Sequence, residues 1–145
     1  MLKRLIVGLV LTIVLVTACG SGDSNDGTRA GAGSTPRPSS PARLTIVTPQ
    51  NGAVVKGPDV PMKLELDGGK VVQPMGNMSG MEIDPREGHI HITVDGQLIS
   101  MNYGLHEPLK NLSAGTHTLR AEFVATDHMP FDPPVFQEIA FTVKR

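Results

Sequence analysis

The stretch THTLRAEFVA, residues 116–125, has a regular period of two. Apolar side chains occupy every second position from Leu119 to Ala125, and the polar Arg120 and Glu122 stand between them. Successive side chains of a β-strand point to opposite faces, so this alternation is typical of a strand with one buried face. The segment predicts a sheet with one face packed against the core and the other face exposed to solvent.

Similar runs lie on both sides of this segment, separated by turn residues. Asp95-Gly96 is a typical two-residue hairpin turn, and the short run Leu109–Leu112 is expected at a sheet edge. No helical period appears after residue 43. About seven short strands with frequent turns predict an all-β, antiparallel β-sandwich. The predicted strands are Arg43–Thr48, Val60–Leu66, His89–Asp95, Gln97–Met101, Leu109–Leu112, Thr116–Ala125 and Val135–Val143.

One motif adds a family resemblance. The segment NLSAGTHTL (111–119), followed by ATD (125–127), resembles the L-x-x-G-x-H-x-L … A-x-D signature of bacterial immunoglobulin-like domains. The resemblance implies a two-sheet sandwich, but it covers little more than one strand and implies no function. His117 stands at the histidine of the signature, so we expect it to have a structural role. The wider pattern, from GHIH (88–91) to PPV (133–135), is similar to small exported domains that mostly lack an assigned role.

The first residues have the organisation of a secretory signal peptide. Lys3 and Arg4 precede an apolar run from Leu5 to Val16, and this run is shorter than the roughly 20 residues of a membrane-spanning helix. The sequence VTAC (16–19) resembles the bacterial lipobox. That resemblance implies cleavage before Cys19 and attachment of two or three acyl chains, palmitate among them, which together anchor a protein stably. The alternative is an ordinary signal peptide followed by an incidental cysteine.

The residues after Cys19 have the composition of a tether. From 20 to 42 there is no large apolar side chain, and the second half contains Pro36, Pro38 and Pro41. Such a segment cannot bury enough apolar surface to offset its ordering entropy. We therefore predict a signal peptide at 1–18, a lipidated cysteine and disordered tether at 19–42, and one domain at 43–145. The expected location is the cell membrane or outer membrane, facing the extracytoplasmic side.

Composition argues against several functions. The chain has 13 basic and 14 acidic residues, no tryptophan and 3% aromatic residues, so it lacks the positive charge and stacking surfaces of a nucleic-acid-binding protein. The single cysteine leaves no internal disulfide. No nucleophile has a base at a recognisable spacing, and an enzyme is not expected. The one enzymatic hypothesis left open is a zinc hydrolase using His89, His91 and a carboxylate such as Asp127.

Topology allows the candidate ligands to be grouped. In an immunoglobulin-like sandwich the third and sixth strands are antiparallel neighbours, so the strand that starts at His89 begins near the end of the strand that finishes at Ala125. The loops 67–88 and 126–134 then share one pole of the domain. His106 and His117 are predicted at the opposite pole, with His106 exposed in a loop. The shared pole collects Met75, Met78, Met81, His89, His91, His128 and Met129.

The motif Met75-x-x-Met78-x-x-Met81 favours copper. Thioethers and imidazoles are soft ligands that suit copper, above all Cu(I). Gly76 and Gly80 interrupt the motif, so it is not the buried stripe of a helix. The spacing resembles the methionine motifs of exported copper-handling proteins. The alternative is that the methionines are flexible apolar filler over the domain.

The histidines complete the predicted ligand set. His89 and His91 are two apart on one strand and share a face, which we expect to point outward with the rings about 7 Å apart. His128 is a third candidate nitrogen donor. The alternatives are a polar outer face and, for His128, a loop-anchoring hydrogen bond. The sequence thus predicts a copper site of six residues in a buffer or carrier, or else a metal-free immunoglobulin-like module that contacts another envelope protein.

Overall fold

The computed structural model describes residues 36–73 and 82–145. These ranges form eight β-strands, and no helix in them is long and apolar enough to cross a membrane. The predicted signal peptide and Cys19 lie outside the described residues. The strands are β1 (Arg43–Thr48), β2 (Val54–Lys56), β3 (Lys63–Asp67), β4 (Lys70–Val71), β5 (Glu87–Val94), β6 (Gln97–Asn102), β7 (Gly115–Ala125) and β8 (Pro130–Lys144).

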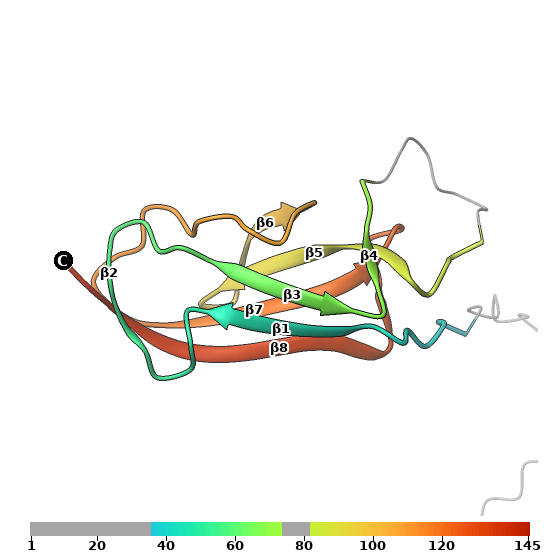
Figure 1. Ribbon diagram of the computed structural model, residues 1–145, viewed down its shortest axis with the longest axis horizontal. Helices are drawn as coiled ribbons and strands as arrows, with labels where there is room; N and C mark the ends of the chain where they lie inside the picture. The colour runs from blue at the N-terminus through green and yellow to red at the C-terminus, as the bar shows by residue number, and fades with distance from the viewer. Residues whose placement is uncertain (1–35, 74–81) are drawn as a thin grey trace, which may run out of the picture. The chain divides into compact units, whose positions relative to one another are not determined.

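The strands form two facing layers. β1 and β3 make a two-stranded antiparallel sheet, and the larger sheet has the order β2-β8-β7-β5-β4, with β6 also paired to β5. Figure 1 shows β1 and β3 in front of the long strands β5, β7 and β8. β7 pairs antiparallel with both β5 and β8. The fold is therefore an all-β, immunoglobulin-like sandwich, as the sequence predicts. Contrary to the expectation, it is not wholly antiparallel, because the short strands β2 and β4 pair parallel with β8 and β5.

The core lies between the two layers and is built by alternation. In β7 the side chains of Leu119, Ala121 and Phe123 are fully buried, whereas those between them are partly exposed. The Phe123 ring stacks on that of Phe131 from β8, with 5.5 Å between ring centroids. Apolar area removed from water stabilises the fold by about 25 cal/mol per Å². The other core side chains include Leu44, Ile46, Val60, Met62, Leu64, Ile90, Ile92, Ile139 and Phe141.

Three predicted strands differ from the structure by more than two residues at one end, and one of them, Val135–Val143, extends over Pro130–Lys144. The predicted strand Val60–Leu66 begins only at Lys63, because Pro61 has no backbone N–H to give to a ladder. The predicted edge strand Leu109–Leu112 is wrong. Only Leu109 pairs, in an isolated bridge with Val60, and Asn111 has a φ of 56°, which ends the extended conformation.

The folded part starts earlier than the predicted boundary at residue 43. The carbonyl of Pro38 accepts a hydrogen bond from the backbone N of Asp132 at 3.1 Å, and Ser40 Oγ donates to the carbonyl of Pro85 at 2.5 Å. Arg37 forms an ion pair with Asp127. A proline-rich segment stays extended with its carbonyls free to accept such bonds. Polar contacts of this kind leave no apolar pattern in the sequence.

His117 has the structural role that its place in the motif suggests. Its ring is buried, with Nδ1 at 2.7 Å from Asp95 Oδ2 and Nε2 at 3.0 Å from the carbonyl oxygen of Ser113. Both partners accept hydrogen bonds, so the arrangement is best satisfied by an imidazolium that donates from both nitrogens. Asp95 Oδ1 also accepts the backbone N–H of Thr118 at 2.9 Å. This group fixes the β5–β6 turn to the start of β7.

The His117 group predicts a pH-dependent stability. The carbonyl of Ser113 and then the carboxylate of Asp95 raise the pKa of His117 above its usual 6.5. A raised pKa in the folded state stabilises the protein fully below the unfolded-state pKa, and this contribution is lost as pH rises through the folded-state pKa. We expect the free energy of unfolding to fall on the alkaline side of about pH 6.5, and we expect His117→Gln to remove this decline. Urea unfolding at stepped pH values measures it, and equal declines in both proteins would contradict the assignment.

Candidate metal centre

A glycine brings the first ligand into place. Gly88 pairs with Ala125, and His89 pairs with Val124. A Cβ atom on Gly88 would lie 2.0 Å from the carbonyl oxygen of Val124, so only glycine lets β5 and β7 approach this closely. His89 therefore lies beside the end of β7, where the chain turns into the loop that carries His128.

The loop between β7 and β8 folds back sharply. The backbone N of His128 donates to the carbonyl of Ala125 at 3.0 Å, and the backbone N of Ala125 donates to the carbonyl of Met129 at 3.0 Å. Asp127 Oδ1 accepts the N–H of Met129 at 3.1 Å. His128 has a φ of 65°, in the left-handed region that histidine adopts more readily than most residues. This conformation carries the His128 ring back over β5.

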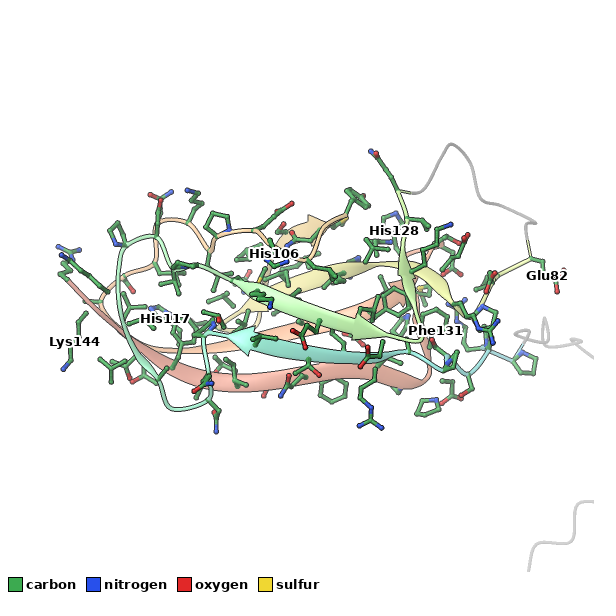
Figure 2. The ribbon with its side chains drawn as sticks, in the orientation of Figure 1. Glu82, His106, His117, His128, Phe131 and Lys144 are labelled. Carbon is green, nitrogen blue, oxygen red and sulfur yellow. The ribbon has the colours of Figure 1, made fainter. Side chains whose placement is uncertain are left out.

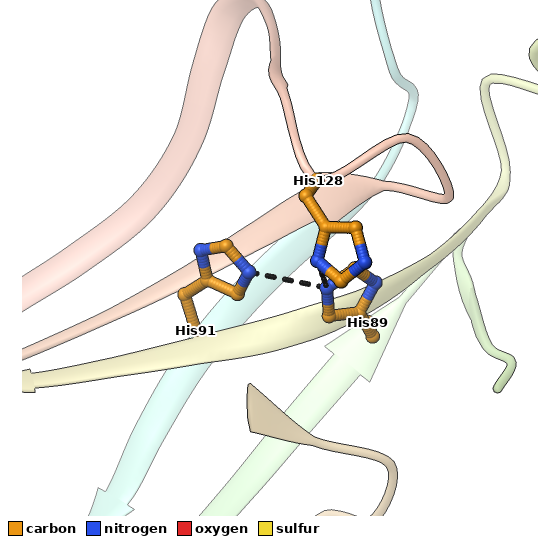
Figure 3. A group of neighbouring side chains, drawn as sticks. All are labelled: His89, His91 and His128. Atoms are coloured by element: carbon orange, nitrogen blue, oxygen red, sulfur yellow. Dashed lines mark hydrogen bonds between the residues drawn. The ribbon is translucent and has the colours of Figure 1, made fainter. Parts of the chain in front are cut away.

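Three imidazoles converge as a result (Figure 3). His89 Nε2 lies 3.1 Å from His91 Nε2 and 3.0 Å from His128 Nδ1. Three ligand nitrogens, one from each ring, lie within 4.8 Å of one another. A tetrahedral ion with metal–nitrogen bonds of about 2.0–2.1 Å holds its ligand nitrogens about 3.3 Å apart. The two distances from His89 are thus close to the spacing of ligands around one ion.

The protonation state of His89 suits a ligand. Its side chain is fully buried, and burial, followed by the nearby His128 and His91, lowers its pKa to about 4. The ring is neutral at physiological pH and offers a lone pair. Burial, with His128 next, also lowers the pKa of His91, against the opposing charge of Glu122.

Hydrogen bonding within the cluster does not satisfy His89. Its Nε2 faces two nitrogens, yet a ring nitrogen of neutral histidine donates or accepts only once. Its Nδ1 is buried with no hydrogen-bond partner among the described residues. An unsatisfied buried polar group costs about 1–3 kcal/mol. The crowding of two nitrogens around Nε2 is therefore better explained by a ligand that all three rings share than by their contacts with one another. Such a ligand does not satisfy Nδ1, which stays unpaired among the described residues.

The predicted exposure of the His89 and His91 side chains needs correction. His89 and His91 do share a face of β5, but His89 is 0% exposed, and the two ring centroids are 5.0 Å apart rather than the expected 7 Å. The His128 ring covers His89 at 4.4 Å between centroids, and the Tyr103 ring lies at 5.6 Å. A loop and a neighbouring strand thus bury a face that strand parity alone places in solvent.

The remaining candidates are placed as follows. Met75, Met78 and Met81 lie outside the described residues. Just before them, the N–H of Val72 donates to the carbonyl of Gly88 at 2.7 Å, beside His89. Figure 2 shows His117 far along the domain from His128, and His106 is exposed and bridges to Lys63 in β3. The structure therefore brings together the three predicted histidine ligands and leaves the other two histidines elsewhere.

Sequence reasoning missed three neighbours of the cluster. Met101 in β6 and Glu122 in β7 are the cross-strand partners of His91, and Tyr103 follows β6. Cross-strand partners share a face of the sheet. Counting outward from the hairpin turn at 95–96 pairs His91 with Ser100. A β-bulge between Ile92 and Thr93 shifts the register and brings Met101 opposite His91, so the turn alone does not predict this neighbour.

Comparisons with known proteins identify no family. No protein-family model matches the chain, and no curated protein matches it. A solved structure of Clostridium thermocellum CbhA fibronectin(III)-like modules is 16% identical, with a TM-score of 0.45, covering 70% of this chain and 94% of that one. The endo-β-1,4-mannanase from Thermotoga petrophila is 14% identical, with a TM-score of 0.44, covering 72% of this chain and 20% of the mannanase. These similarities say nothing about the histidine cluster.

Proposed function

We propose that this protein is a lipid-anchored lipoprotein of the cell envelope whose β-sandwich binds a copper ion, as a buffer or as a carrier to a partner. The observation that carries the proposal is the convergence of the nitrogens of His89, His91 and His128 within 4.8 Å. Burial keeps His89 neutral, and a neutral imidazole is the ligating form.

Copper is favoured over other ions by methionines that neighbour the histidines in the strand register and in the sequence. Met101 is the cross-strand partner of His91, and Met129 follows His128 and is 54% exposed. The motif at Met75, Met78 and Met81 supplies further thioethers in the sequence. Imidazole alone suits zinc, copper and nickel, whereas thioether sulfur selects copper, especially Cu(I). A site that offers both ligand types can hold copper in either oxidation state.

Metal content tests the proposal. The protein is extracted in detergent from copper-supplemented cells, stripped, reloaded with Cu(II) or with Cu(I) under a reductant, and desalted. We expect about one copper ion per chain after either loading, by elemental analysis. Copper retained at the level of a loaded control protein that lacks a histidine cluster would contradict the function.

The anchor is tested at Cys19. Because stable attachment takes more than one acyl chain on this cysteine, Cys19→Ala should leave uncleaved precursor or release the protein from the membrane. Metabolic labelling with a fatty-acid analogue, followed by membrane fractionation, measures both effects. Equal labelling of the wild type and the variant would rule out the lipid anchor, and it would leave the copper site to be judged on its own.

A metal-free interaction module is the second candidate function, and β6 favours it. Leu98, Ile99, Met101 and Tyr103 are each 43–49% exposed, and among the described strands β6 pairs with β5 alone. An apolar edge strand readily pairs with another chain. Under this function the protein would capture an envelope partner without copper, and Ile99→Lys would abolish the capture.

A further inference from the structure

One side chain from the N-terminal segment holds the loop that carries His128. Arg37 Nη1 and Nη2 donate to the two carboxylate oxygens of Asp127, at 2.5 and 3.0 Å. Nη2 also donates to the carbonyl of Met129 at 3.1 Å, and Nε donates to the carbonyl of Pro130 at 2.9 Å. The planar guanidinium thus contacts the residue before His128 and the two residues after it.

This contact is more specific than an ordinary surface ion pair. A bidentate arginine–carboxylate pair fixes both the distance and the plane of its partner, which lysine cannot do. The Arg37 and Asp127 side chains are only 27% and 30% exposed. The neighbouring bond from Asp132 N to the Pro38 carbonyl, 3.1 Å long, fastens the segment on the far side of the loop.

The loop that carries His128 needs a contact from outside the loop to hold it against β5. His128 is exposed and adopts a φ of 65°, a conformation that side chains with a Cβ disfavour. Its own hydrogen bonds join residues 125–129 to one another, and of these only Ala125, at the end of β7, pairs with β5. The only polar contact of the loop with β5 that the described residues show is the one between the His128 and His89 rings. The loop can therefore keep its internal bonds and still tilt away from β5.

We infer that Arg37 is a positioning residue for His128, so that the segment joining the membrane anchor to the domain also completes the metal centre. This inference rests on the proposed function, because the positioned ring matters through the ion that it ligates. A carrier built in this way holds the ion with three imidazoles while the segment is docked, and with two when it is not.

Removing the Arg37 side chain is expected to lower the copper affinity, because one imidazole no longer ligates the ion. Groups that only orient a metal ligand are typically worth about 10–100-fold in metal affinity. Arg37→Ala should weaken Cu(II) binding by about that factor and reduce the imidazole nitrogens seen by electron paramagnetic resonance from three to two. Arg37→Lys keeps the charge without the bidentate fork, so its Cu(II) affinity should lie between those of the wild type and Arg37→Ala. Arg43→Ala removes an exposed arginine from β1 and serves as the matched control.

A copper-free measurement separates this inference from the function on which it rests. In NMR spectra of the detergent-solubilised, copper-free protein, the ring protons of His89 and His128 should show mutual Overhauser contacts in the wild type and in Arg43→Ala. These contacts should disappear in Arg37→Ala. If they persist in Arg37→Ala, the positioning role is overturned, whether or not copper binds. If they disappear while the wild type takes up no copper, the proposed function fails and the loop support stands.

Discussion

Replacing Phe123 with alanine is expected to lower the free energy of unfolding by about 3–5 kcal/mol, the usual cost of truncating a buried phenylalanine. The ring is 0% exposed and stacks on Phe131 across the β7–β8 pair. It also lies close under Gly88, where an added Cβ would meet a Phe123 ring carbon at 3.1 Å. The cavity left behind would be enclosed by the long strands and could not collapse easily. Urea unfolding followed by circular dichroism measures the change.

Phe136 provides a matched control for this prediction. It is also a phenylalanine of the large sheet, but it is 46% exposed and its ring lies 3.5 Å below the guanidinium carbon of Arg120. An exposed cation–π contact is worth about 0.5–1 kcal/mol, so Phe136→Ala should cost about that much. Similar losses from the two substitutions would mean that the core does not lie between the layers as described.

Removing two imidazoles is expected to lower the Cu(II) affinity more than about 100-fold, since even groups that merely orient a ligand are worth about 10–100-fold. The substitutions His91→Ala and His128→Ala are preferred, because His91 is only half-buried and His128 is exposed, whereas His89 is fully buried and its truncation would leave a cavity. Competition with a chelator for each oxidation state measures the affinities. Cu(II) binding should suffer most, because this ion favours nitrogen donors.

Two further variants distinguish the effect of the methionines from that of a histidine outside the cluster. Replacing Met75, Met78 and Met81 together should weaken Cu(I) binding more than Cu(II) binding, because imidazole alone is less selective for the softer ion. His106→Ala should change neither affinity, since His106 is exposed beside Lys63 and outside the cluster. If His106→Ala and the double His91/His128 variant lose affinity equally, the effect is one of surface histidines in general.

Alternation in the sequence was enough to predict most of the fold. β1 and β7 were predicted within a residue, because each has several apolar side chains at a period of two facing the opposite sheet. β2 and β4 have three and two residues, too few for any period to show, and they were missed. The residues 109–112 look like a strand, yet Asn111 adopts a left-handed conformation that the apolar pattern does not reveal.

The histidine cluster was predicted from topology, and its details were not. Antiparallel pairing of β5 with β7 places His89 near His128 whatever the side chains do, so the convergence followed from the strand order. The burial of His89 depends on how the loop folds back, which is a tertiary effect. The contribution of Arg37 was hidden because it lies about 90 residues from Asp127 in the chain and sits in a segment whose composition suggests disorder.

The coordination of the loaded ion tests the central claim most directly. X-ray absorption and electron paramagnetic resonance of the Cu(II)-loaded wild-type protein count the imidazole nitrogens bound to the metal. The account predicts one copper ion per chain with three imidazole ligands, from His89, His91 and His128. A spectrum with no more than one imidazole, unchanged in the double His91/His128 variant, would contradict it.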